Sequence, residues 1–165
     1  MKIESIIFHQ IKMPLVSPFE TSFGRETDRE CIIVEIKSEG VTGYGECVAT
    51  RDPGYNYETT GTVMHILSEF ITPLILGKDV KDALDFQEKV ASIRGHHLAK
   101  AGVEMALWDL LGKREGKSLR ELFGGKREKV EVGVSVGIQE TAQGLVRTVK
   151  DYVKQGYARV KIKIK

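Results

Sequence analysis

The spacing of the apolar residues changes twice along the chain, and this limits the fold more than any other feature. Apolar and polar residues alternate over residues 2–13, 31–37 and 41–47, which predicts strands, with residues 38–40 as a hairpin turn. From Glu58 the spacing becomes helical, and helices are expected near residues 58–77, 82–93, 98–114 and 119–123. After Gly125 the expected order is a strand at 130–136, a helix at 141–155 and a strand at 157–165. The first part predicts an α+β domain, and the last part predicts a βαβ unit with parallel strands.

We therefore expect two domains: residues 1–125 as an α+β domain, and residues 126–165 as the first strand, helix and strand of a (β/α) TIM-type barrel. Such a barrel takes ~250 residues, whereas 165 − 125 leaves 40 here. Two parallel strands and one helix cannot cover both faces of a sheet. The barrel is thus expected to be incomplete in this sequence, and the chain to be the front portion of a longer protein.

Composition and charge limit the partners and the compartment. The net charge is only +2, which gives no reason to expect a nucleic acid partner. The longest apolar run, near Phe70, is too short to span a membrane, and residues 1–14 have no apolar stretch typical of a signal peptide. Cys31 and Cys47 are interpreted as small packing residues in a reducing compartment. A cytoplasmic protein with no membrane partner is expected.

Lysines alternate with β-branched residues in the last expected strand. Lys161, Lys163 and Lys165 share one face, because successive side chains of a strand point to opposite sides. In a closed barrel these lysines would point inward, where an ammonium group needs a partner or a task. Neighbouring ammonium groups ease each other's deprotonation, which suits a general base. On spacing alone, a half-exposed strand with solvated lysines is the better explanation.

Two long connections, at residues 14–30 and 49–57, carry the aromatic residues Phe19, Phe23 and Tyr55. Long loops in a small domain often serve function, for example as lids, although ordinary packing of the loop is the simpler explanation.

Other motifs favour structural roles. The sequence Gly43-x-Gly45-Glu46 has no third glycine and no following helix, so it predicts a tight bend in a strand rather than a phosphate site. The adjacent residues His96 and His97 do not share a helix face, and we expect them at an exposed helix end rather than on a metal. Residues 113–129 are basic but lack interleaved aromatic residues, which favours a solvated helix end and linker over a nucleic acid site.

The motifs in this order resemble those of the enolase superfamily, specifically its muconate-lactonizing-enzyme branch. The resemblance covers the whole chain but less than half of a complete family member. It is carried by the stretches Gly43-Tyr44-Gly45-Glu46, Ala106-Leu107-Trp108-Asp109-Leu110-Leu111-Gly112-Lys113, Leu122-Phe123-Gly124-Gly125 and Gly156-Tyr157-x-Arg159-Val160-Lys161-Ile162-Lys163.

Within this branch, the chain is most similar to o-succinylbenzoate synthases and N-acylamino acid racemases. The matching stretches are Pro18-Phe19-x-Thr21-Ser22-Phe23-Gly24, Tyr55-Asn56-x-Glu58-Thr59 and Val132-Gly133-Val134-Ser135-Val136-Gly137. Gly54 departs from that group, which often has a bulky aromatic residue before the tyrosine. The pocket for the acyl or aryl group is therefore expected to differ.

The resemblance implies an N-terminal capping domain and an enzyme, a lyase or isomerase, that removes the proton α to a carboxylate while Mg²⁺ stabilises the enediolate. Lys163 would be the acid/base and Lys161 its electrostatic neighbour, and Phe19, Phe23, Tyr55 and Ser135 would contact a small carboxylate substrate. No metal ligand is assigned within this sequence, so the chain alone is expected to be inactive. The complete protein is expected to be a homo-oligomer.

Several alternatives remain open. A dipeptide epimerase or muconate cycloisomerase of the same branch fits the same motifs. A noncatalytic binding module would explain the lack of metal ligands. A nucleic acid binder would use the lysine-rich stretches 113–129 and 161–165, and its affinity would fall steeply with salt.

Overall fold

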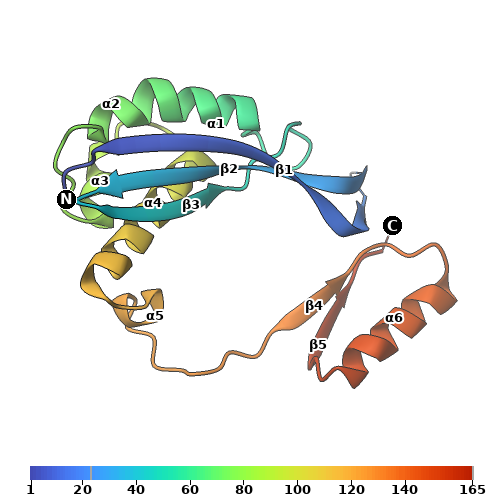
Figure 1. Cartoon of the computed structure of the whole chain (residues 1–165). Coiled ribbons are helices and arrows are strands. Elements are labelled where there is room, and N and C mark those ends of the chain that lie inside the picture. The colour runs from blue at the N-terminus through green and yellow to red at the C-terminus, as the bar shows by residue number, and fades with distance from the viewer. Residues whose placement is uncertain (23, 165) are drawn as a thin grey trace. The chain divides into compact units, whose positions relative to one another are not determined.

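The computed structural model describes residues 1–22 and 24–164 and divides the chain into two compact units. The first unit comprises Met1–Met13 and Glu30–Lys126, and the second comprises Pro14–Arg29 and Arg127–Lys165 (Figure 1). Phe23 and Lys165 lie outside the described residues. Within those residues, we find no helix with the length and apolarity that crossing a membrane requires.

Three strands form one sheet in the order β1-β2-β3: β1 (Ser5–Thr21), β2 (Gly24–Ser38) and β3 (Val41–Cys47). The expected hairpin is confirmed, since β2 and β3 pair antiparallel from Ile32↔Cys47 to Ser38↔Val41. Its turn residues, Glu39 and Gly40, have φ angles of 52° and 78°. Positive φ at both turn positions matches the right-handed twist of the flanking strands.

The loop expected at residues 14–30 is wrong, because β1 continues to Thr21 and β2 already begins at Gly24. Pro14 and Pro18 lie within β1. They are compatible with β1 because it is an edge strand of the sheet, where a missing backbone N–H can face away from the neighbouring strand. Residues 14–21 therefore lengthen β1 and residues 24–30 lengthen β2, and together they form the far part of a β1–β2 hairpin.

The first helical region is continuous but changes its winding. Helix α1 (Thr60–Ile66) begins at a capping box formed by Thr59 and Thr62. It leads into the π-helical turn η1 (Leu67–Ile71) and then into α2 (Thr72–Ile75), which has a proline in its first turn. A wider turn before Pro73 accommodates a residue that has no backbone N–H and whose ring crowds the preceding turn. The region then ends at Gly77, which has a φ of 72°.

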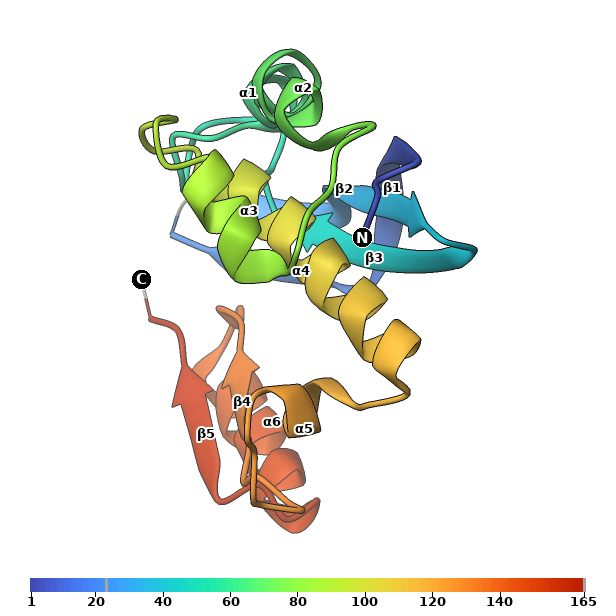
Figure 2. The same cartoon turned by 90° about the vertical axis from the view of Figure 1, so that its left-hand side faces the viewer.

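The remaining helices of the first unit confirm the expected positions. Helix α3 (Ala83–Lys89) has Asp82 as its N-cap, and α5 (Leu119–Leu122) starts from a capping box of Ser118 and Glu121. The longest helix, α4 (His97–Glu115), carries the motif around Trp108. The helices lie on one face of the sheet (Figure 2). Trp108 is partly buried and packs against the core.

The core lies between the sheet and the helices. Ile32, Val34 and Ile36 alternate along β2 and are fully buried, together with Val103 and Leu107 of α4. Complete burial of such side chains stabilises the folded state by about 1.5–3 kcal/mol each before the entropy cost of ordering them.

Helix α4 and strand β3 are in direct backbone contact. A Cβ atom on Gly45 would lie 2.0 Å from the carbonyl oxygen of Gly102, and one on Gly43 would lie 2.2 Å from that of Ala106. Gly102 and Ala106 of α4 therefore allow β3 to approach the helix backbone closely. The bend expected at Gly43-x-Gly45 is wrong: both residues lie within β3, where they leave room for the helix.

The second unit contains the expected strand, helix and strand: β4 (Gly133–Val136), α6 (Ala142–Lys154) and β5 (Arg159–Ile162). The two strands pair in parallel, from Gly133↔Arg159 to Val136↔Ile162. The strand expected from residue 130 begins only at Gly133, and Val130 and Val132 are 71% and 65% exposed. Helix α6 has Thr141 as its N-cap, and the Thr141 side chain accepts a hydrogen bond from the backbone N–H of Gly144.

Candidate active site

Three of the expected site residues lie on or directly after the parallel strands of the second unit. Ser135 of β4 is the register partner of Lys161 of β5, and both side chains are exposed. The pairing extends beyond β5, because the backbone N–H of Lys163 donates to the carbonyl oxygen of Val136 at 3.1 Å. Lys163 is half-buried. The register therefore brings Ser135 and Lys161 together and places Lys163 directly after the carboxyl end of β5.

Phe19 joins this group from the far end of the β1–β2 hairpin, within the same unit. The Lys163 Nζ atom lies 3.7 Å from the centroid of the Phe19 ring. The next residue, Glu20, accepts a backbone hydrogen bond from the N–H of Ile138 at 3.3 Å, so the hairpin is attached to the segment that follows β4. In parallel α/β folds, the segments after the carboxyl ends of the strands carry ligand sites.

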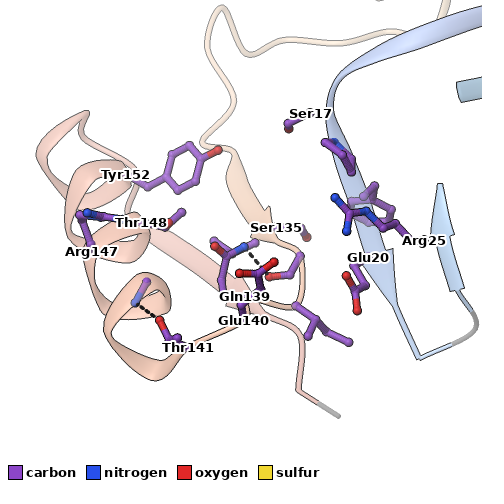
Figure 3. Close-up of a pocket in the computed structure, with 16 residues that line it drawn as sticks. Ser17, Glu20, Arg25, Ser135, Gln139, Glu140, Thr141, Arg147, Thr148 and Tyr152 are labelled. Atoms are coloured by element: carbon purple, nitrogen blue, oxygen red, sulfur yellow. Dashed lines mark hydrogen bonds between the residues drawn. The ribbon is translucent and has the colours of Figure 1, made fainter. Parts of the chain in front are cut away.

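A cavity of about 550 Å³ lies within this unit. Figure 3 shows that its walls come from the hairpin, from the end of β4 with the loop after it, and from α6. Ser135 and Phe19 line it, and it contains charges of both signs, from Arg25, Arg147, Glu20 and Glu140. A polar ligand of small-molecule size fits such a cavity. Neither arginine was predicted from the sequence, because isolated charged residues in a strand and a helix have no pattern that distinguishes them from solvated ones.

Tyr55 lies in the first unit, on the connection between β3 and α1, and is 83% exposed. Phe23 lies outside the described residues.

A buried carboxylate at the end of the Tyr55 connection was also missed. Glu58 is only 1% exposed. Its two carboxylate oxygens accept from the backbone N–H groups of Leu98 and Ala99, at 2.9 and 3.2 Å, in the first turn of α4. A negative charge at this position satisfies free donors and complements the helix dipole. A single glutamate forty residues away from the helix in sequence offers no signal for this contact.

No metal site forms within residues 1–22 and 24–164. These residues contain no group of three or more His, Cys, Asp or Glu side chains that could hold a metal ion. The described residues thus do not form a metal site by themselves.

The geometry so far defines an α+β domain followed by a parallel βαβ unit with lysines at the end of its second strand. Comparison with known families matches residues 2–124 to the N-terminal domain of the mandelate racemase / muconate lactonizing enzyme family. The chain belongs to this family. Its first unit corresponds to most of the family's capping domain, which confirms the expected fold class.

Individual relatives agree with this assignment. The chain is 43% identical over 166 residues to the o-succinylbenzoate synthase of Geobacillus kaustophilus, covering 100% of this chain and 44% of the relative. It is 40% identical over 165 residues to the N-succinylamino acid racemase of Thermus thermophilus, covering 100% of this chain and 45% of the relative. A crystal structure of an enolase superfamily member from Listeria innocua aligns with a TM-score of 0.93 and 37% identity, covering 99% of this chain and 44% of the other. The chain therefore spans less than half the length of these relatives.

Proposed function

We propose that this chain is part of an enzyme that removes the proton α to a carboxylate, as an o-succinylbenzoate synthase, an N-succinylamino acid racemase or both. The observation that carries the proposal is the placement of Lys163 after the carboxyl end of β5, next to the register pair of Ser135 and Lys161. The whole-chain similarity to relatives with these two names supports the choice of substrate class.

In this proposal, Lys163 transfers the proton and Lys161 is its electrostatic neighbour. Positive charge beside the reacting carbon favours the negative charge that develops on the substrate's carboxylate as the proton leaves. Ser135, Phe19, Phe23 and Tyr55 contact the substrate. The exposed hydroxyl of Ser135 suits a polar part of the substrate, and the aromatic residues suit an apolar or aryl part.

The remaining parts of the reaction belong to segments that the relatives have and this chain does not span. A synthase eliminates water and needs one lysine base. A racemase also needs a second proton-transfer group on the opposite face of the substrate, because the proton leaves one face and returns to the other. The ligands of the divalent metal that is typical of the enolase superfamily are likewise assigned to those segments.

The test is exchange of the α-proton in D₂O by a full-length protein containing this chain, with an N-succinylamino acid as substrate. We expect Lys163→Ala to lose a large part of the ~10²–10⁴-fold contribution typical of a positioned acid/base group. Lys126→Ala is the matched control, because Lys126 is an exposed lysine in the first unit. Undiminished exchange by Lys163→Ala would overturn the assignment.

The product separates the candidate reactions of the same enzyme. Synthase activity forms o-succinylbenzoate with loss of water, racemase activity changes optical rotation without loss of mass, and a dipeptide epimerase or muconate cycloisomerase acts on neither substrate. A noncatalytic binding module would bind the carboxylate without exchanging its proton.

The proposal further includes a cytoplasmic homo-oligomer whose partners are small carboxylates rather than nucleic acids or membranes. It also includes a domain boundary near residue 125.

A further inference from the structure

The contact between Phe19 and Lys163 is fixed from both sides by the backbone. Glu20, next to Phe19, accepts from the N–H of Ile138, and Lys163 donates its own N–H to the carbonyl of Val136. The backbone at Glu20 and at Lys163 is therefore held to neighbouring positions at the end of β4, although the two residues come from opposite ends of the chain. Gly137 lies between these two attachment points, and a Cβ atom placed on it would lie 3.9 Å from Cδ2 of Phe19.

The attraction between Lys163 and Phe19 depends on which side of the ring the ammonium group approaches. The face of an aromatic ring carries partial negative charge, and an ammonium group within about 6 Å of the ring centroid is attracted to it. At 3.7 Å, Nζ of Lys163 lies well inside this range. Among the described residues, no carboxylate forms an ion pair with Lys163. The ring is thus the group that orients a long side chain with several rotatable bonds.

We propose that Phe19 is a positioning residue for Lys163, in addition to any contact that it makes with substrate. The ring holds the ammonium group at the end of the β1–β2 hairpin and so couples the placement of this hairpin to that of the proton-transfer group. The inference rests on the proposed function only in taking Lys163 as that group. The oriented contact itself is a property of the chain with or without activity.

The contact is tested on the 165-residue chain by NMR, after ¹³C-dimethylation of its lysines, which preserves their positive charge. We expect the methyl signal of Lys163, assigned with Lys163→Arg, to be shifted upfield by the ring current, away from that of the exposed Lys161. Phe19→Leu removes the aromatic face and should return the signal to the position of Lys161, whereas Phe19→Tyr should keep it shifted. Phe70→Leu is the matched control, because Phe70 is a half-exposed phenylalanine of the first unit.

A Lys163 signal that coincides with that of Lys161 in the unsubstituted chain, or that stays unchanged in Phe19→Leu, overturns the proposal. If Phe19→Leu does not fold, the methyl signals of Lys163 and Lys161 in the unsubstituted chain still decide whether the ring lies over Lys163.

The consequence for catalysis is tested in the full-length protein. Phe19→Leu should lower kcat for α-proton exchange by about three- to tenfold and change KM by less than about twofold, because a cation–π contact of ordinary strength is lost while substrate binding is largely kept. Phe19→Tyr should restore kcat. A loss confined to KM overturns the positioning role and leaves Phe19 as a substrate contact only. If the unsubstituted protein neither exchanges the α-proton of an N-succinylamino acid nor forms o-succinylbenzoate, the proposed function fails. The NMR result still decides whether Phe19 orients Lys163.

Discussion

The carboxylate of Asp109 on α4 accepts a hydrogen bond from the backbone N–H of Tyr44 on β3, with 2.8 Å between the nitrogen and Oδ2. Lys113 lies 2.6 Å from the same oxygen, and its ammonium group is 4.9 Å from the centroid of the Tyr44 ring. Strand β3 is an edge of the sheet, where outward N–H groups need other partners. Two motifs that are far apart in the sequence are therefore linked by one polar cluster.

Removing the Asp109 carboxylate should destabilise the first unit. We expect Asp109→Ala to lower the free energy of unfolding by about 1–2 kcal/mol, since it removes a charged acceptor of a backbone N–H. Asp109→Asn should cost less, because its amide oxygen still accepts from Tyr44. Urea unfolding followed by fluorescence of Trp108, the single tryptophan, measures the effect. Glu115→Gln is the control: it weakens an ion pair with Lys117 on the exposed surface and should leave stability nearly unchanged. Equal stability of Asp109→Ala and the unsubstituted chain would contradict the proposed role.

The glycines that separate β3 from α4 should not tolerate a methyl group. Gly45→Ala is expected to cost about 3 kcal/mol or more, because its Cβ would overlap the backbone oxygen of Gly102 and the two elements would have to move apart. Gly61→Ala is the matched control in α1, where the nearest atom to a new Cβ is 3.8 Å away. This change should stabilise the helix by about 0.5–1 kcal/mol. The same urea titration compares them, and similar stabilities for both variants would refute the close-packing explanation.

The sequence predicted the helix starts and the hairpin turn, because these features depend on residues close together in the chain. Thr141, Asp82 and Ser118 were near expected helix starts, and each accepts the capping hydrogen bond from its own helix. The turn at Glu39 and Gly40 was recognised for the same reason. Periodicity failed at residues 14–30. These parts of β1 and β2 lie beyond the stretch that pairs with β3, and they contain no fully buried residue, so no buried face creates alternation.

The candidate site was predictable only in part. The alternation of Lys161 and Lys163 indicates a shared strand face, and the family resemblance indicates a role, but neither indicates which residue lies opposite. The partners Ser135 and Phe19 follow from strand register and from the hairpin. Such contacts join residues far apart in sequence, and a single sequence without aligned homologues carries no pairwise signal for them.

Glu58 should stabilise the first unit through the start of α4. Glu58→Ala is expected to lower the free energy of unfolding by about 1–3 kcal/mol, because it leaves the buried N–H groups of Leu98 and Ala99 without their acceptor. Glu58→Gln should restore only part of the lost stability. Its amide oxygen can accept from one of the two N–H groups, but its amide NH₂ is a donor and cannot accept from the other. Trp108 fluorescence in urea again gives the free energy. Glu69→Ala, an exposed glutamate of η1, is the control, and a loss as large as that of Glu58→Ala would show that the effect is not specific to the buried carboxylate.

Cys47 should make stability depend on pH in the alkaline range. Its side chain is fully buried beneath α4. Burial, with a smaller contribution from the nearby charge on Glu58, raises the pKa of the thiol from 9.0 to about 12. The unfolded chain therefore releases this proton at lower pH than the folded chain. The stabilising contribution is complete below pH 9 and is lost as the pH rises towards 12.

The predicted dependence is measured as a difference between the unsubstituted chain and Cys47→Ala. Above pH 9, the unfolding free energy of the unsubstituted chain should fall by about 1.4 kcal/mol per pH unit relative to that of the variant. The cavity left by alanine shifts the variant's stability by an amount that does not vary with pH, so it leaves this slope unchanged. Iodoacetamide at pH 8 provides an independent check: Cys47 should be alkylated rapidly in urea and very slowly in the folded chain, since only the thiolate reacts. A pH-independent difference between the two proteins, or rapid alkylation of folded Cys47, would show that the thiol is not held in its neutral form by burial.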